Sequence, residues 1–469
     1  MTGTDAVISL FENQLKQNCE IHSLTVYRGG KKIFSGAPCP YSTHDKNQVY
    51  SMSKSFCSTA VGIAQDKGLL SLNEKIIDIF PEKCPEKISD NLAQMTLLHV
   101  LSMNTGHEEC VMNKMITSDD PVAAFLSSEV KYVPGTHFTY NTGATFLASA
   151  CINRRTGMSA YEFLEKNLFE DLDIRGAQWN SRFGISEGGV GLHISSEDAA
   201  KLGLLYLYGG VYGGKRLLSE DYCSLAVSKI SDNSLNGNPD WCAGYGLQFW
   251  KNSREGFRAD GAFGQLCMVF PEKELVVAMI AENGDMQKEI DCVYDFADNI
   301  CGGGNTETTD SDTLSDYLKK YYIAGQFSEK TPSFAGKTYI FEENPCGFSK
   351  LTSEKTENGI TIYISGSYDA CLTSRIEIKS GKWTKGILHG NYVKPDLDGF
   401  TASHNCDLYY SACGFPEDEN SGEFTVMLRA LNCPHKVTYT FKTEGEKLKI
   451  TRKGGYNSGH YAEFTAREA

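Results

Sequence analysis

A polar, glycine-rich stretch separates two parts of this chain that follow different sequence patterns. Residues 301–312 read CGGGNTETTDSD, a composition typical of a linker. Before this stretch, apolar residues recur both at helical spacing and in short strand-like runs. From about residue 336, short alternating strands are separated by turn residues. We therefore expect one domain over residues 1–300, a linker with a short helix near 314–323 over 301–335, and a β-domain over 336–469.

The first part of the chain predicts a sheet built from both of its ends. A hairpin is predicted over residues 23–36, around a Gly-Gly turn. A run at 244–250 begins a second set of strands, followed by adjacent antiparallel strands at 258–270 and 274–281 and a helix over 286–300. This order predicts one α/β domain. The β-domain is predicted to form an antiparallel barrel or sandwich from strands at 338–341, 361–364, 424–428, 437–441 and 448–451.

Charge and cysteine usage narrow the classes of partner and cofactor. The chain has 45 basic and 59 acidic residues, a net charge of −14, which argues against nucleic acid or an anionic membrane as the main partner. No signal peptide or bilayer-spanning apolar run is visible, so the 16 cysteines are expected to be reduced thiols of a cytoplasmic protein. Neither C-x-x-C nor H-E-x-x-H occurs, and the ten histidines are dispersed. We therefore predict a small-molecule substrate, no metal and no cofactor, and the sequence leaves the oligomeric state open.

Ser51 and Lys54 form the chain's most chemically suggestive pair. The sequence predicts a helix that begins at or just after Ser51 and ends before Gly68. Residues i and i+3 share a helix face, so the Ser51 hydroxyl and the Lys54 amine can meet. A serine becomes a good nucleophile when a base accepts its proton, and a lysine serves as that base only if its pKa is lowered. Taken alone, an S-x-x-K sequence is more typical of a serine N-cap followed by a solvated lysine.

Further motifs along the chain, taken together with Ser51 and Lys54, are more diagnostic of a protein family than that pair alone. They are YSMSKSF at 50–56, LLHVLSM at 97–103, PGTHFTY at 134–140, GGVGL at 188–192 and GYGLQFW at 244–250. This order resembles the serine β-lactamase and penicillin-binding protein superfamily, and in particular the β-lactamase-related hydrolases that include class C β-lactamases, D-aminopeptidases, esterases and 6-aminohexanoate-dimer hydrolases. The resemblance covers roughly residues 20–300. It implies a β-lactamase/transpeptidase-like α/β (α+β) fold, with an antiparallel sheet flanked by helices, a helical subdomain and an additional C-terminal β-domain.

The resemblance also implies a role for each matched position. Ser51 would be the nucleophile of an acyl-enzyme, and Lys54 would share its proton chemistry with Tyr140. Neighbouring groups are expected to lower the Tyr140 pKa from its usual value of about 10, so that the phenol relays a proton. The oxyanion hole would be formed by the backbone N–H groups of Ser51 and Ala262, the residue after Gly261. The glycines at 188–191 are expected to allow a tight backbone crossing.

Two positions depart from the family pattern. Thr142 stands where the family's Y-x-N motif has asparagine, and it keeps only a hydroxyl to contact a substrate amide. Ala259-Asp260-Gly261 replaces K-T-G or H-T-G, so the cation that reads a substrate carboxylate is missing. Arg258 is one residue away, and a shift of one residue in a strand points to the other face. Asp260 is expected to add negative charge that disfavours anionic substrates such as β-lactams.

These observations predict a serine hydrolase that acts on a small ester, amide or D-amino-acid peptide. The predicted site consists of Ser51, Lys54 and Tyr140, with Thr142 and residues 260–262 (Asp260, Gly261 and Ala262) contacting the substrate or its oxyanion. Two alternatives remain open at this stage. One is a family member that has lost catalysis and binds a ligand, which the replacement of K-T-G by Ala259-Asp260-Gly261 favours. The other is a true β-lactamase.

Overall fold

The computed structural model describes residues 2–302, 309–322, 332–366, 373–389, 408–416, 422–454 and 461–469. The chain divides into two compact units, one of Met1–Ala37 with Ser42–Tyr317 and the other of Pro38–Tyr41 with Leu318–Ala469. The domain boundaries proposed from the sequence stay a prediction. The predicted short helix is present as α13 (Ser311–Tyr321), although the predicted last residue of that helix and much of the linker lie outside the described residues.

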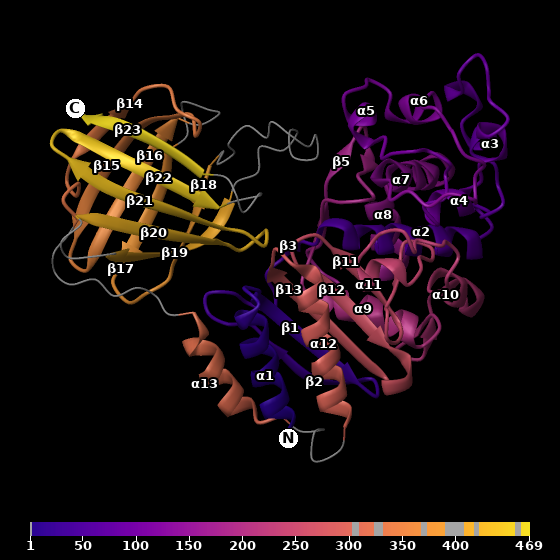
Figure 1. Ribbon diagram of the computed structural model, residues 1–469, viewed down its shortest axis with the longest axis horizontal. Helices are drawn as coiled ribbons and strands as arrows, with labels where there is room; N and C mark the ends of the chain where they lie inside the picture. Colours follow the sequence, from indigo (N-terminus) through magenta and orange to yellow (C-terminus); the bar gives the residue numbers. More distant parts are fainter. Residues whose placement is uncertain are drawn as a thin grey trace. The chain divides into compact units, whose positions relative to one another are not determined.

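The first unit contains a six-stranded antiparallel sheet in the order β10-β11-β12-β13-β1-β2 (Figure 1). Its strands come from both ends of the unit, as the sequence predicted. Helices α1 and α12 pack against each other on one side of the sheet, and α9 packs on β1, β12 and β13 on the other. The bounds are α1 (Gly3–Lys16), β1 (Glu20–Arg28), β2 (Lys31–Gly36), α9 (Ser196–Leu207), β10 (Trp250–Lys251), β11 (Phe257–Gly261), β12 (Gln265–Phe270), β13 (Leu275–Glu282) and α12 (Met286–Cys301).

Local sequence explains how these strands are joined. Gly29 and Gly30 both have positive φ, the conformation that a type I′ hairpin turn requires, so β1 and β2 pair as predicted. The predicted strands at 258–270 and 274–281 are β11, β12 and β13. The predicted strand at 244–250 is wrong except at its end, because Gly244 and Gln248 adopt positive φ and the extended backbone begins only with β10.

Helices between residues 53 and 164 form the predicted helical subdomain. Helix α2 (Ser53–Asp66) ends at Lys67, and Gly68 follows with φ of 70°, as expected for a glycine just beyond a helix. Helix α7 (Thr142–Thr156) packs against α2 and ends at Gly157 in the left-handed conformation. The shorter members are α3 (Ile76–Ile79), α4 (Leu97–Leu101), α5 (Met112–Ile116), α6 (Pro121–Leu126) and α8 (Ala160–Leu164). This subdomain supplies one wall of the candidate site.

The second unit is a ten-stranded antiparallel sheet in the order β17-β16-β15-β14-β23-β22-β21-β20-β19-β18. Alternate residues of β17 and β21 are buried, as expected when a sheet curls around its own core. The two end strands approach each other, because the Thr384 hydroxyl of β18 donates to the Glu377 carbonyl of β17. The sheet is thus a nearly closed barrel, and the sandwich alternative is excluded. Its strands are β14 (Thr338–Phe341), β15 (Phe348–Thr356), β16 (Gly359–Gly366), β17 (Thr373–Lys379), β18 (Thr384–Leu388), β19 (Leu408–Pro416), β20 (Glu423–Ala430), β21 (Lys436–Glu444), β22 (Lys447–Gly454) and β23 (Tyr461–Glu468).

Across the ranges given above, none of the helices is both long and apolar enough to cross a bilayer.

Candidate active site

The candidate nucleophile lies in a tightly held turn at the start of α2. Ser51 is the middle residue of a 3-10 helix, Tyr50–Met52, that leads directly into α2. The turn is fixed by the Ser53 hydroxyl, which donates to the Tyr50 carbonyl at 2.5 Å and accepts from the Leu192 N–H at 3.2 Å. Helix α2 has no side-chain cap, so the N-cap interpretation of Ser51 is wrong. Its hydroxyl is instead engaged by Lys54.

Lys54 is buried directly beneath this hydroxyl. Its side chain is 1% exposed, and Nζ lies 3.0 Å from Ser51 Oγ and 2.8 Å from the Gly189 carbonyl oxygen, to which it donates. Burial lowers the pKa of Lys54 to about 7, because the charged ammonium loses its hydration. A lysine needs such a lowered pKa to act as a base. A large fraction of this amine is therefore unprotonated at neutral pH.

Tyr140 completes the arrangement from the loop before α7. The Lys54 Nζ lies 5.0 Å from the centre of its ring, which stacks on the ring of Trp250 at 5.3 Å and meets the ring of Tyr245 edge-on at 6.2 Å. Burial raises the pKa of Tyr140 and the nearby Asp260 adds to this rise, while a hydrogen bond with Ser51 opposes it. The expectation that neighbouring groups lower this pKa is thus wrong. Tyr140 is a neutral phenol at rest, suited to donate a proton rather than to remove one.

Asp260, in the stretch that replaces K-T-G, forms a buried ion pair with Arg258. Arg258 and Asp260 are two residues apart on β11 and so share a face, and Arg258 Nε donates to Asp260 Oδ2 at 2.8 Å. Arg258 is fully buried, and its guanidinium lies over the rings of Trp241 and Trp250 at 4.8 and 5.7 Å. Arg258 therefore compensates the negative charge that Asp260 was expected to add. Burial still raises its pKa, with Arg258 opposing the rise.

Gly261 brings the end of β11 against the nucleophile turn. A Cβ at this position would collide with the Val49 carbonyl oxygen and lie 3.1 Å from the Ser51 nitrogen, so only glycine permits this approach. Ala262 comes next, in the loop between β11 and β12. The Gln265 amide holds this loop by donating to the carbonyls of Ala262 at 3.3 Å and Phe263 at 3.1 Å. The N–H of Ala262 as an oxyanion donor stays a prediction.

In the region of the family's Y-x-N motif, this chain has an asparagine at position 141, and that asparagine has a structural role. Asn141, one residue before the family's position, is the N-cap of α7, where its Oδ1 accepts from the N–H groups of Gly143 at 3.0 Å and Val111 at 3.2 Å. Thr142 is buried, and its methyl carbon lies where a Cβ on Gly189 would stand. This close approach accounts for the glycine and agrees with the predicted backbone crossing. Contact of Thr142 with a substrate amide stays a prediction.

Several contributors were missed by sequence reasoning. The carbonyl that accepts a hydrogen bond from Lys54 belongs to the backbone of Gly189, so the residue type gives no indication of it. The aromatic wall of Tyr140, Tyr245 and Trp250 joins residues about a hundred positions apart, with Tyr245 and Trp250 4.7 Å from each other. The Arg258–Asp260 pair had a readable signal, since the i, i+2 spacing on a predicted strand places both on one face.

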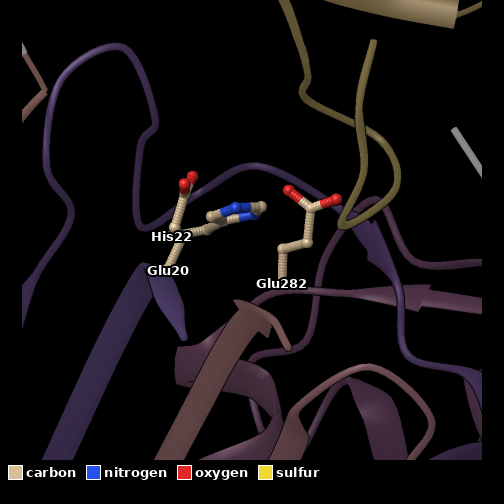
Figure 2. Close-up of side chains that lie close together, drawn as sticks. All are labelled: Glu20, His22 and Glu282. Carbon is tan, nitrogen blue, oxygen red and sulfur yellow. The ribbon is translucent and has the colours of Figure 1, made fainter. Parts of the chain in front are cut away.

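A separate group of residues has the composition of a metal-ligand set. Glu20, His22 and Glu282 bring one ligand atom each to within 4.8 Å of one another (Figure 2). The sequence predicted no metal, because the residues come from the two ends of the first unit and form no compact motif. This cluster is distinct from Ser51 and its neighbours.

Comparison with known proteins agrees with this fold. The sequence profile of the Beta-lactamase family matches residues 8–289. The chain is 23% identical over 295 residues to a 6-aminohexanoate-dimer hydrolase from Paenarthrobacter ureafaciens, a match that covers 58% of this chain and 74% of that protein. The structure of a putative 6-aminohexanoate-dimer hydrolase from Bacillus anthracis superimposes with a TM-score of 0.52 at 17% identity, covering 62% of this chain and 81% of the other. An octameric penicillin-binding protein homologue from Pyrococcus abyssi gives 0.53 at 14% identity and covers 99% and 100%.

The sequence match defines the class of protein, a hydrolase related to the β-lactamases, and the structural similarities show the same fold. The chain belongs to the Beta-lactamase family.

Proposed function

We propose that this protein hydrolyses a small ester, amide or D-amino-acid peptide through an acyl-enzyme on Ser51. The observation that carries the proposal is the 3.0 Å contact between Ser51 Oγ and the Nζ of a buried Lys54 whose pKa is about 7. A nucleophile and a base in hydrogen-bond contact are the minimal machinery for acyl transfer. The name of the Paenarthrobacter relative, a 6-aminohexanoate-dimer hydrolase, supports a linear amide among the substrates to test.

In the proposed acylation step, unprotonated Lys54 accepts the Ser51 hydroxyl proton while Oγ attacks the substrate carbonyl carbon. The negative charge that develops on the carbonyl oxygen is stabilised by the N–H groups of Ser51 and Ala262, at the start of a helix and at the end of β11. Tyr140 then donates its proton to the leaving oxygen or nitrogen, and the protonated Lys54 returns a proton to the phenolate. Water attacks the ester on Ser51 by the reverse sequence of proton transfers, releasing the acid.

The proposed substrates need no charged group next to the reacting carbonyl. Arg258, which precedes the stretch that replaces K-T-G, is fully buried and paired with Asp260. Neither side chain is therefore available to bind a carboxylate or an ammonium group of a substrate. Removing such a pair from water already costs several kcal/mol per ion, and breaking it would leave one charge uncompensated. Uncharged esters and amides therefore fit better than β-lactams, whose carboxylate would lack a partner.

The test is labelling with a fluorophosphonate probe, followed by a panel of nitrophenyl esters, linear amides, D-peptides and nitrocefin. We expect one label at Ser51, ester hydrolysis that Ser51→Ala abolishes, and slow nitrocefin turnover. Ser71→Ala is the matched control, because Ser71 is exposed. Absence of labelling, combined with ligand-induced stabilisation, would support the ligand-binding alternative. Rapid nitrocefin hydrolysis would identify a β-lactamase instead.

A further inference from the structure

Two carboxylates lie opposite each other at the end of the central β1–β13 pair. Glu20 of β1 is the register partner of Glu282 of β13. Like charges directly opposite on neighbouring strands repel each other, so this pairing is unfavourable unless a positive charge lies between them.

A β-bulge adds a histidine to these carboxylates. The register passes from Ile21 opposite Ala281 to Ser23 opposite Ile280, so His22 is the extra residue of the bulge. Bulges redirect side chains and recur near functional sites. His22 is 1% exposed, whereas Glu20 and Glu282 are partly exposed. Figure 2 shows the imidazole ring lying between the two carboxylates. The cluster thus has a buried nitrogen ligand and two oxygen ligands that an ion from solvent can reach.

We propose that Glu20, His22 and Glu282 form a binding site for one divalent transition-metal ion of the Zn²⁺ type. An imidazole nitrogen with two carboxylate oxygens is a ligand set that suits Zn²⁺, and three protein ligands leave a coordination position for water. Zn–N and Zn–O bonds of about 2.0–2.2 Å place tetrahedral ligand atoms roughly 3.4 Å apart. The three ligand atoms already lie within 4.8 Å of one another, and small rotations of the two flexible glutamates close the difference.

The position of the cluster indicates a structural role. The ion would join β1 to β13 at the end of that strand pair. The next residue, Asn283, donates its backbone N–H to the Phe263 carbonyl at 3.0 Å, in the loop that carries Ala262. The Phe263 ring in turn contacts Tyr50, 5.2 Å away, beside the nucleophile. A bound ion would therefore stabilise the end of the β1–β13 pair, next to this loop, without contacting a substrate.

Binding is tested on the full chain with the metal alone, so the result does not depend on whether the proposed hydrolase activity is correct. The purified protein is stripped with a chelator and titrated with Zn²⁺, Co²⁺ and Mg²⁺ by calorimetry and thermal unfolding. We expect one Zn²⁺ per chain, a Tm that rises to a plateau with added Zn²⁺, and no comparable effect of Mg²⁺, which prefers oxygen ligands and retains its waters. Co²⁺ provides an absorption spectrum that reports the ligand atoms.

Variants and spectra separate this site from adventitious binding. Glu282→Gln and Glu20→Gln keep side-chain size and should weaken binding by on the order of a hundredfold. His22→Ala should abolish binding, with circular dichroism as the check on folding. His44→Ala, an exposed histidine, should have no effect. Cys39 and Cys110 are exposed thiols, and a thiolate-to-cobalt charge-transfer band would show that they, rather than the cluster, hold the ion. That band, the absence of saturable binding, or equal binding by the glutamine variants would overturn the proposal.

Discussion

The pKa of Lys54 determines how the rate of acylation at Ser51 should vary with pH. With a pKa of about 7, the unprotonated fraction of Lys54 is about 0.1 at pH 6 and about 0.9 at pH 8. The kcat/KM for a nitrophenyl ester should therefore rise about tenfold between these pH values and then level off, because only the free amine accepts the Ser51 proton. Replacing the amine by a group that stays protonated, in Lys54→Arg, should remove this rise and lower kcat/KM by about 10²–10⁴-fold.

The assay is the initial rate of ester hydrolysis at low substrate from pH 5.5 to 9.5 at constant ionic strength, corrected for spontaneous hydrolysis. Lys67→Arg is the control, because Lys67 is exposed at the other end of the same helix and should leave the profile unchanged. A rate that stays flat between pH 6 and 8, or that keeps rising toward pH 10, would refute the argument that burial makes Lys54 a base at neutral pH. Full activity of a folded Lys54→Arg variant would do the same.

Three further predictions concern the surroundings of this pair. Gly261→Ala places a methyl group against the Val49 carbonyl oxygen, so β11 must move. We expect the free energy of unfolding to fall by about 1–3 kcal/mol in a denaturant titration and kcat for ester hydrolysis to fall at least a hundredfold. Near-native values of both would contradict the close approach. Asp260→Asn removes the nearer of the two carboxylates that pair with the buried Arg258 and leaves only Asp240, 3.9 Å away, so it should destabilise the fold by about 1–3 kcal/mol, whereas an unchanged midpoint would show that the Asp260 contact is dispensable. Burial raises the pKa of Glu289 to about 8, so between the usual carboxyl pKa and pH 8 the folded state binds a proton that the unfolded state lacks, and stability falls as pH rises. Glu289→Gln should remove a fall of about 1.4 kcal/mol per pH unit in that window, and equal pH slopes for the two proteins would refute this.

Patterns within a short stretch of sequence predicted much of the fold. The hairpin of β1 and β2 and the end of α2 follow from glycines at positions that need positive φ. The order of motifs also predicted the sheet and the β-domain. The strand proposed at 244–250 failed because its apolar residues pack from an irregular loop, where burial resembles that of a strand without the extended backbone.

The geometry of the site was predictable only where it is local. Ser51 and Lys54 are three residues apart, and their contact followed from helix periodicity. The pKa of Tyr140 was not predictable, because it depends on burial in the folded chain and on Asp260, which lies far away in sequence. Glu20 and Glu282 likewise meet only when the two ends of the first unit pair.

The Arg258–Asp260 pair restricts the routes by which this sequence can change. Substituting Asp260 alone, toward the threonine of a K-T-G motif, leaves the buried Arg258 with only the more distant Asp240, and substituting Arg258 alone leaves two buried carboxylates without their cation. Each single step is therefore expected to pass through a destabilised protein, whereas the double substitution removes the closest ion pair in one step. Selection for activity on carboxylate-bearing substrates would thus have to pass through less stable single variants. In a library built one residue at a time, neither member would emerge as a beneficial change, so laboratory evolution of this enzyme should mutate the two positions jointly.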